Sequence, residues 1–182
     1  MLGMVNQAVE DMARSLGGEP LWRQIAEGAG VDPDVGFLRM EAYPDELTID
    51  LVHSASSLLG LSADEVLEAF GKHWILYTGE NGYGHLLRSA GSDLKTFIAN
   101  MNLLHGKIES MMPSTRCPRF SSQETGPTSL RLTYRSHRRG LGALVSGLLK
   151  GLGERFGTPL QVHSLAPEED SQVFEISWEQ PP

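Results

Sequence analysis

The sequence LTYRSHRRGLG, from Leu132 to Gly142, places polar side chains where a buried strand would carry apolar ones. Residues two apart in a strand share one face, so the pattern predicts Tyr134, Ser136 and Arg138 on the same side. All three side chains donate hydrogen bonds, and arginine pairs with both oxygens of a carboxylate or phosphate. This face therefore indicates a site for a ligand with two carboxylates. The pattern leaves open that Arg138 pairs with an Asp or Glu of the protein and that the hydroxyls bond locally.

The regions on either side of this stretch predict a small sheet. Apolar and polar residues indicate strands at about 130–136, 160–164 and 173–178, and Phe120 is expected in one more short strand. A helix is expected at about 141–156, where glycines at helical spacing indicate close packing on the sheet. The sheet is expected to be mainly antiparallel, with the helix packed against it.

The chain before this region has the apolar spacing of helices. Ser62 and Glu65 form a capping-box pattern at the start of one helix, whose predicted apolar face includes Trp74 and Tyr77. The chain is thus expected to be α+β, with a helical N-terminal subdomain at about 1–62 and a C-terminal subdomain containing the sheet at about 63–182. The expected helices are at about 2–16, 20–29, 44–60, 62–78, 83–89 and 93–112, the last one ended by Pro113.

His105 lies on the apolar stripe of the longest predicted helix, four residues after Met101 and three before Ile108. A neutral imidazole is a common metal ligand, and a single helical histidine often holds haem iron. Spacing alone also allows a core histidine that is hydrogen-bonded to a carbonyl. His105 is therefore a candidate metal ligand, and the alternative is a buried histidine with a purely structural role.

Composition narrows the possible functions. The net charge of -8 argues against nucleic-acid binding, which needs a basic surface. The single cysteine, Cys117, excludes an internal disulfide and a multi-cysteine zinc site. No apolar run approaches the roughly 18 residues of a membrane span, and the N-terminus does not resemble a signal peptide, so a cytoplasmic protein without a membrane partner is expected. The nucleotide-binding and hydrolase motifs are absent, and no enzymatic activity is expected.

Nearly the whole chain resembles the haem nitric oxide/oxygen-binding (H-NOX) family, which includes the haem domain of soluble guanylate cyclase. The resemblance rests on MEAYPDELTIDLV, NMNLLHGKI, CPRF and YRSHR, and cyanobacterial members look most similar. It implies the H-NOX fold and a non-covalent haem b with His105 as proximal iron ligand. It further implies that Tyr134, Ser136 and Arg138 hold the haem propionates. The remaining implied contact is Pro118, which would press on the haem.

The helix that follows YRSHR bears on which gas binds. Family members that hold oxygen tightly have a distal tyrosine there, whereas this chain has GLGALVSGLLKGL. The matching position is about Leu144, with Leu148 one turn later. Because distal hydrogen-bond donors decide oxygen binding, the resemblance implies a protein that binds NO and CO and discriminates against O2. Trp74 matches a distal position in cyanobacterial relatives, and its indole N–H is expected to tune rather than to confer oxygen binding.

The resemblance implies a signalling role through a separate protein, such as a histidine kinase or a cyclic-dinucleotide enzyme. NO binding would weaken the bond between His105 and iron, and the resulting conformational change would be detected by that partner. The alternative is a haem carrier or ligand-binding module without signalling. A haem peroxidase fits less well, because the predicted distal helix lacks the His and Arg that such chemistry uses. A haem-free protein with Arg138 in an internal salt bridge is the remaining alternative.

Overall fold

The computed structural model describes residues 1–112, 115–166 and 171–179, and their side chains except at 78–83. The chain divides into two compact units, Met1–Phe70 and Gly71–Pro182. The first unit is helical and the second combines helices with a sheet, which confirms the α+β class. The subdomain boundary near residue 62 stays a prediction. Among the described residues, none of the helices has the length and apolar character that crossing a membrane requires.

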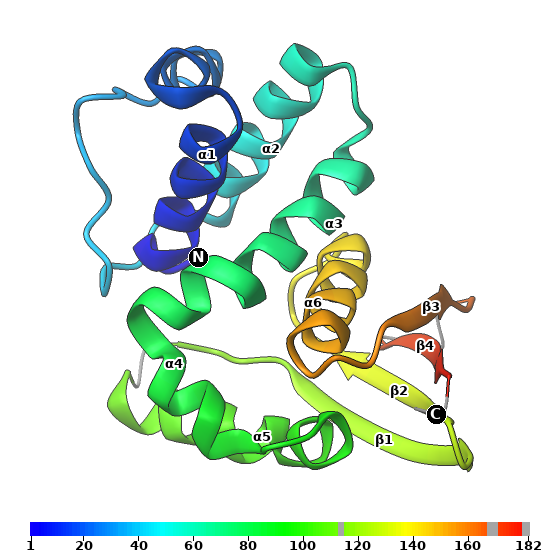
Figure 1. Cartoon of the computed structure of the whole chain (residues 1–182). Helices are drawn as coiled ribbons and strands as arrows, with labels where there is room; N and C mark the ends of the chain where they lie inside the picture. The colour runs from blue at the N-terminus through cyan, green and yellow to red at the C-terminus, as the bar shows by residue number, and fades with distance from the viewer. Residues whose placement is uncertain (113–114, 167–170, 180–182) are drawn as a thin grey trace. The chain divides into compact units, whose positions relative to one another are not determined.

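The first unit contains α1 (Gly3–Gly28) and α2 (Asp45–Leu59), which pack side by side (Figure 1). The backbone leaves helical geometry at Gly17 and Gly18, and Gly18 has φ 67°. The two helices predicted at 2–16 and 20–29 are therefore the two arms of α1. A left-handed residue, Gly60, ends α2.

Helix α3 (Ala63–His73) begins with the predicted capping box. Ser62 N–H donates to Glu65 Oε2 at 2.8 Å, and Glu65 N–H donates to Ser62 Oγ at 3.2 Å. The two residues thus satisfy each other's backbone donors at the start of the helix. This part of the prediction is confirmed at the level of single atoms.

A π-helical turn, η1 (Trp74–Thr78), follows α3 and leads into α4 (Gly79–Ala90). The prediction of an uninterrupted apolar face through Tyr77 is wrong, since the Tyr77 side chain is 59% exposed while Ile75 is 5% exposed. A π turn closes its hydrogen bonds between residues five apart rather than four. The wider turn rotates the buried face, so Ile75 enters the core and Tyr77 leaves it.

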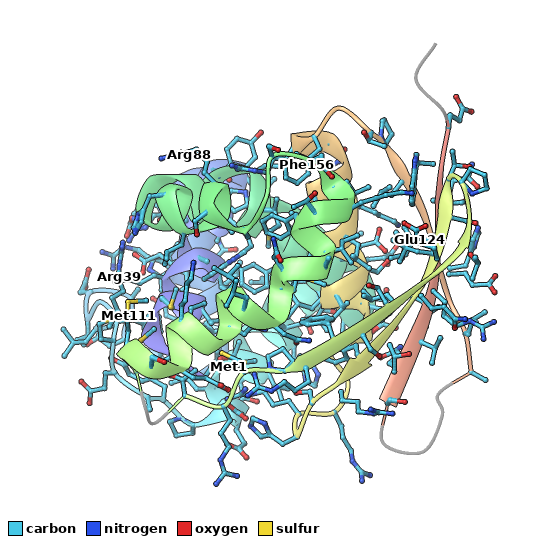
Figure 2. The ribbon with its side chains drawn as sticks, turned by 90° about the horizontal axis from the view of Figure 1, so that it is seen from below. Met1, Arg39, Arg88, Met111, Glu124 and Phe156 are labelled. Atoms are coloured by element: carbon cyan, nitrogen blue, oxygen red, sulfur yellow. The ribbon has the colours of Figure 1, made fainter. Side chains whose placement is uncertain are left out.

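The core of the second unit forms between α5 (Leu94–Met111) and the sheet. Asp93 caps α5 by accepting a hydrogen bond from Thr96 N–H at 2.9 Å. Figure 2 shows Phe156 beside the first turns of α5, where its ring centroid lies 5.8 Å from that of Phe97. The predicted apolar stripe is buried at Leu94, Phe97, Ile98, Met101, Leu104 and Met112, whereas Met111 is exposed. Pro113, the predicted end of this helix, lies outside the described residues.

Four antiparallel strands form one sheet in the order β1-β2-β4-β3. Leu132 on β2 and Phe174 on β4 are paired across the sheet and fully buried. Helix α6 (Gly142–Arg155) contributes Val145, Leu149 and Leu152 to the same core. The strands are β1 (Arg119–Gly126), β2 (Ser129–Arg135), β3 (Leu160–Ser164) and β4 (Ser171–Trp178). The predicted mainly antiparallel sheet and its helix are thus confirmed.

Candidate functional site

His105 lies on α5 with its ring held against the chain that leads into β1. Its Nδ1 atom is 3.1 Å from the carbonyl oxygen of Pro118. A carbonyl oxygen can only accept, so Nδ1 must carry the proton, and a neutral ring then has its lone pair on Nε2. Burial lowers the pKa of His105, while the Pro118 carbonyl and the Glu109 carboxylate oppose this shift. The ring is therefore held in the neutral tautomer that binds metals through Nε2.

A hydrogen bond from histidine to a carbonyl is equally expected of a core histidine. The residues around His105 must therefore distinguish a metal ligand from a core histidine. The Phe120 ring lies close to both His105 and Tyr134, with centroid distances of 5.6 Å and 5.4 Å. Phe120 and Tyr134 also face each other across the β1–β2 pair. We call the predicted carboxylate-binding residues Tyr134, Ser136 and Arg138 the carboxylate clamp. The candidate metal ligand His105 and the first clamp residue, Tyr134, thus both contact the Phe120 ring.

The clamp residues are brought together by a turn and not by one strand face. Strand β2 ends at Arg135, so only Tyr134 lies in a strand, and the predicted strand alternation through Ser136 and Arg138 is wrong. The chain bends after Arg135, and Arg138 N–H donates to Ser136 Oγ at 3.1 Å. Short polar side chains often hold turns in this way.

Tyr134 and Arg138 both carry protons that they can donate in this turn. Burial raises the pKa of the Tyr134 hydroxyl, opposed by a hydrogen bond from Ser136 and by the charge of Arg138. The phenol is therefore protonated at neutral pH. The Arg138 guanidinium donates from Nη1 to the carbonyl of Arg116 at 3.3 Å. A guanidinium has five N–H donors and can bind several acceptors at once.

The predicted distal residues lie on elements that pack closely. A Cβ added at Gly71 would lie 2.3 Å from the carbonyl oxygen of Leu144 and 2.7 Å from the backbone nitrogen of Leu148. Only glycine allows the backbone at position 71 and α6 to approach this closely. Trp74 begins the π turn just beyond this contact, and Trp74 and Leu148 are partly buried against the core. The structure therefore brings the elements that carry Trp74, Leu144 and Leu148 side by side.

Two residues that sequence reasoning missed lie near His105 on α5. Asn102 and Glu109 are three residues before and four residues after it, and both bond the segment that contains Pro118. Their helical spacing places them on the face of His105. That spacing was the available signal, but the backbone groups they bind lie up to 18 residues away in the sequence.

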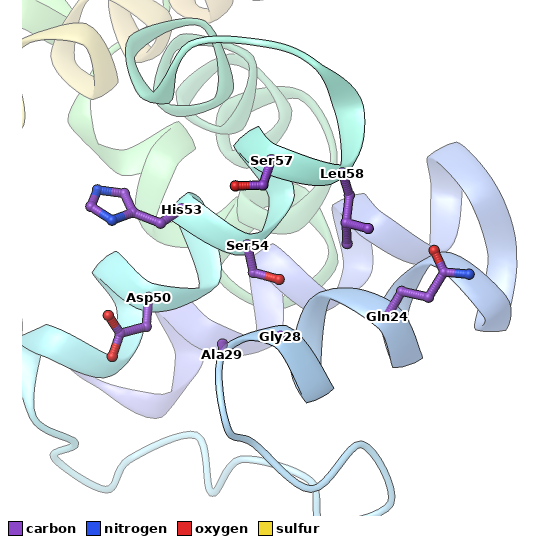
Figure 3. Close-up of a pocket in the computed structure, with 8 residues that line it drawn as sticks. All are labelled: Gln24, Gly28, Ala29, Asp50, His53, Ser54, Ser57 and Leu58. Carbon is purple, nitrogen blue, oxygen red and sulfur yellow. The ribbon is translucent and has the colours of Figure 1, made fainter.

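A separate groove lies between α1 and α2 in the first unit (Figure 3), with a volume of about 480 Å³. None of the predicted site residues lines it. Its walls are mostly polar or small, and Leu58 is its large apolar residue. The lining residues are Gln24, Gly28, Ala29, Asp50, His53, Ser54, Ser57 and Leu58.

A neutral histidine with its lone pair on Nε2, together with a phenol, a hydroxyl and an arginine, has the chemistry that a metal cofactor with carboxylates would require. Residues 2–164 match the family model described as haem-NO-binding. The chain belongs to this haem-NO-binding, or H-NOX, family, whose members bind haem and sense gases.

Relatives of known name and structure agree with this assignment. The soluble guanylate cyclase gcy-32 of Caenorhabditis elegans is 31% identical over 157 residues, which are 85% of this chain and 23% of that protein. The soluble guanylate cyclase gcy-34 of the same organism is 30% identical over 152 residues, which are 82% of this chain and 22% of that protein. The chain thus spans less than a quarter of the length of either relative.

Two solved structures share the fold of this chain. An H-NOX protein from S. oneidensis in the Fe(II)NO ligation state has a TM-score of 0.87 at 18% identity, over 99% of this chain and 100% of that one. An unliganded Fe(II) H-NOX protein from K. algicida has a TM-score of 0.84 at 20% identity, over 100% of this chain and 98% of that one. The H-NOX fold predicted from the sequence is confirmed.

Proposed function

We propose that this chain is a gas sensor that binds NO and CO at ferrous haem b, with His105 as the proximal ligand, and that discriminates against O2. The observation that carries the proposal is the bond from His105 Nδ1 to the Pro118 carbonyl, which directs the lone pair to Nε2. Membership of the haem-NO-binding family supports it independently.

Haem b would supply the iron at which a gas binds, together with two propionates. Tyr134, Ser136 and Arg138 would donate hydrogen bonds to these propionates, and the arginine would add a charge-assisted pair. Pro118, whose carbonyl orients His105, would contact the macrocycle on the same side. The bond between His105 and Pro118, the bond between Arg138 and Ser136, and the contact between Phe120 and Tyr134 support these proposed roles.

The proposed gas selectivity rests on the distal residues. Leu144 and Leu148 have no side-chain donor, and the Trp74 indole N–H is the donor among the three predicted distal residues. Bound O2 carries partial negative charge and gains from a distal donor, whereas NO and CO gain little. An apolar distal wall therefore favours NO and CO.

Visible absorption spectra test the cofactor and the selectivity together. The reduced protein is expected to show a haem band that shifts with CO and with NO and does not form a stable oxygen complex in air. A preparation with no haem band after reconstitution would overturn the cofactor assignment. A stable ferrous–oxygen complex would overturn the selectivity alone.

We also propose that the chain signals to a separate protein, such as a histidine kinase or a cyclic-dinucleotide enzyme. The match to one segment of much longer guanylate cyclases supports a sensory module that acts on an effector. The activity of such a kinase or cyclic-dinucleotide enzyme is expected to change when the sensor is loaded with NO, and to stay at the basal level with the unliganded sensor. Equal effects of both forms would favour a haem carrier.

A further inference from the structure

Three side chains on one face of α5 hold a four-residue segment, Cys117–Phe120, which we call the proximal strap. They are Asn102, His105 and Glu109, spaced three and four residues apart. Every residue of the proximal strap forms at least one hydrogen bond with these three side chains. The strap is therefore fastened to the helix along its whole length.

Glu109 fastens the first half of the proximal strap. Its Oε1 accepts the backbone N–H of Cys117 at 2.9 Å, and its Oε2 accepts Arg119 Nη2 at 2.8 Å. Both bonds are charge-assisted, a type roughly twice as strong as a bond between neutral groups. One carboxylate thus binds the residue before Pro118 and the residue after it.

Asn102 fastens the other end. Its Nδ2 donates to the carbonyl oxygen of Phe120 at 2.6 Å, and its Oδ1 accepts the backbone N–H of Phe120 at 2.9 Å. This paired amide contact fixes the chain where β1 begins and where the Phe120 ring meets His105. Asn102 and Glu109 therefore hold the strap on both sides of its central residue.

The central residue, Pro118, has no backbone N–H with which to anchor itself. Its carbonyl direction depends on how the residues on either side of it are held. Glu109 binds the backbone N–H of Cys117 before it and the side-chain guanidinium of Arg119 after it. That carbonyl is the acceptor for His105 Nδ1. Replacing Glu109 would therefore shift the Pro118 carbonyl and, through it, the His105 ring. Glu109 itself need not contact a ligand bound at Nε2 of His105.

We propose that Glu109 is a positioning residue, which sets the tautomer and orientation of His105 by holding the proximal strap. A hydrogen bond from Nδ1 makes Nε2 a stronger donor to a metal. Loosening the strap would weaken that bond and the donor strength of Nε2. The part that concerns iron rests on the proposed function, whereas the part that concerns the ring does not.

The haem-free protein tests the proposal by ¹⁵N NMR of the His105 ring and by amide exchange at Cys117. Wild type is expected to show one tautomer with the proton on Nδ1. Glu109→Ala is expected to give a mixture of tautomers and about tenfold or faster exchange at Cys117, because a charge-assisted bond is lost. Glu109→Gln, which can still accept from Cys117, is expected to lie between them and covers the case that the alanine variant does not fold.

Glu124→Gln is the matched control, because it breaks an exposed ion pair to Lys95 (3.1 Å) elsewhere in the same unit. Figure 2 shows Glu124 on the strand pair beyond α5. In the haem-loaded protein, Glu109→Ala is expected to lower the iron–histidine stretching frequency and to reduce haem affinity about 10–100-fold. Unchanged tautomer and unchanged Cys117 exchange in Glu109→Ala would overturn the positioning role. Failure of haem to bind wild type would overturn the proposed function and leave the NMR result standing.

Discussion

Replacing His105 with glycine is expected to abolish haem retention unless imidazole is added. The change removes the side chain that we propose as the iron ligand, and leaves a space of the size of the lost ring. Loss of a residue that only orients a metal ligand costs about 10–100-fold in affinity, so loss of the ligand itself is expected to cost at least as much. Haem content of the purified protein, read from its visible spectrum with and without excess imidazole, measures the effect.

Glycine in a helix interior also costs about 1 kcal/mol relative to alanine, so stability must be separated from ligation. His53→Gly is the matched control, since His53 is an exposed histidine in the interior of α2. It is expected to show a similar helix penalty with full haem content. Retention of a normal ferrous spectrum by His105→Gly without imidazole would show that another residue holds the iron.

Local patterns predicted most of the fold because the decisive forces are local. The apolar stripe of α5, the Ser62–Glu65 capping box and the glycine that ends α2 each depend on residues within one or two helical turns. The π turn at Trp74–Thr78 was not predictable in this way. Its apolar residues fit an ordinary helix, and only packing in the core selects Ile75 over Tyr77.

The candidate site was predictable in its residue types and only partly in its geometry. The donors Tyr134, Ser136 and Arg138 were predicted from their spacing on a strand, although two of them lie in the turn that follows β2. Glu109 was missed because its role lies in bonds to Cys117 and Arg119, which are brought to it by the return of the chain from α5 into β1. Side chains that act on distant backbone groups leave no signal in local spacing.

Replacing Arg138 with alanine is expected to accelerate haem loss without changing the iron ligand. A hydrogen bond to a charged group contributes about 1.5–3 kcal/mol, and an unpaired propionate would lose it. At about 1.4 kcal/mol for each factor of ten, haem affinity is expected to fall roughly 10–100-fold. The transfer rate of haem to an excess of a haem-free globin measures this loss, while the iron–histidine stretching frequency is expected to stay at the wild-type value.

Two further variants separate the guanidinium fork from its charge. Arg138→Lys keeps the charge but lacks the planar pair of donors, so an intermediate transfer rate is expected. Arg131→Ala removes a charge from the same basic stretch, where Arg131 makes an exposed contact to Glu175 at 3.4 Å, and a rate close to wild type is expected. If Arg131→Ala and Arg138→Ala accelerate haem loss equally, the positive charge of the basic residues as a group holds the haem. The proposed contact between Arg138 and a propionate is then wrong. If Arg138→Ala alone does so, the polar stretch after β2 holds a carboxylate that comes from outside the chain.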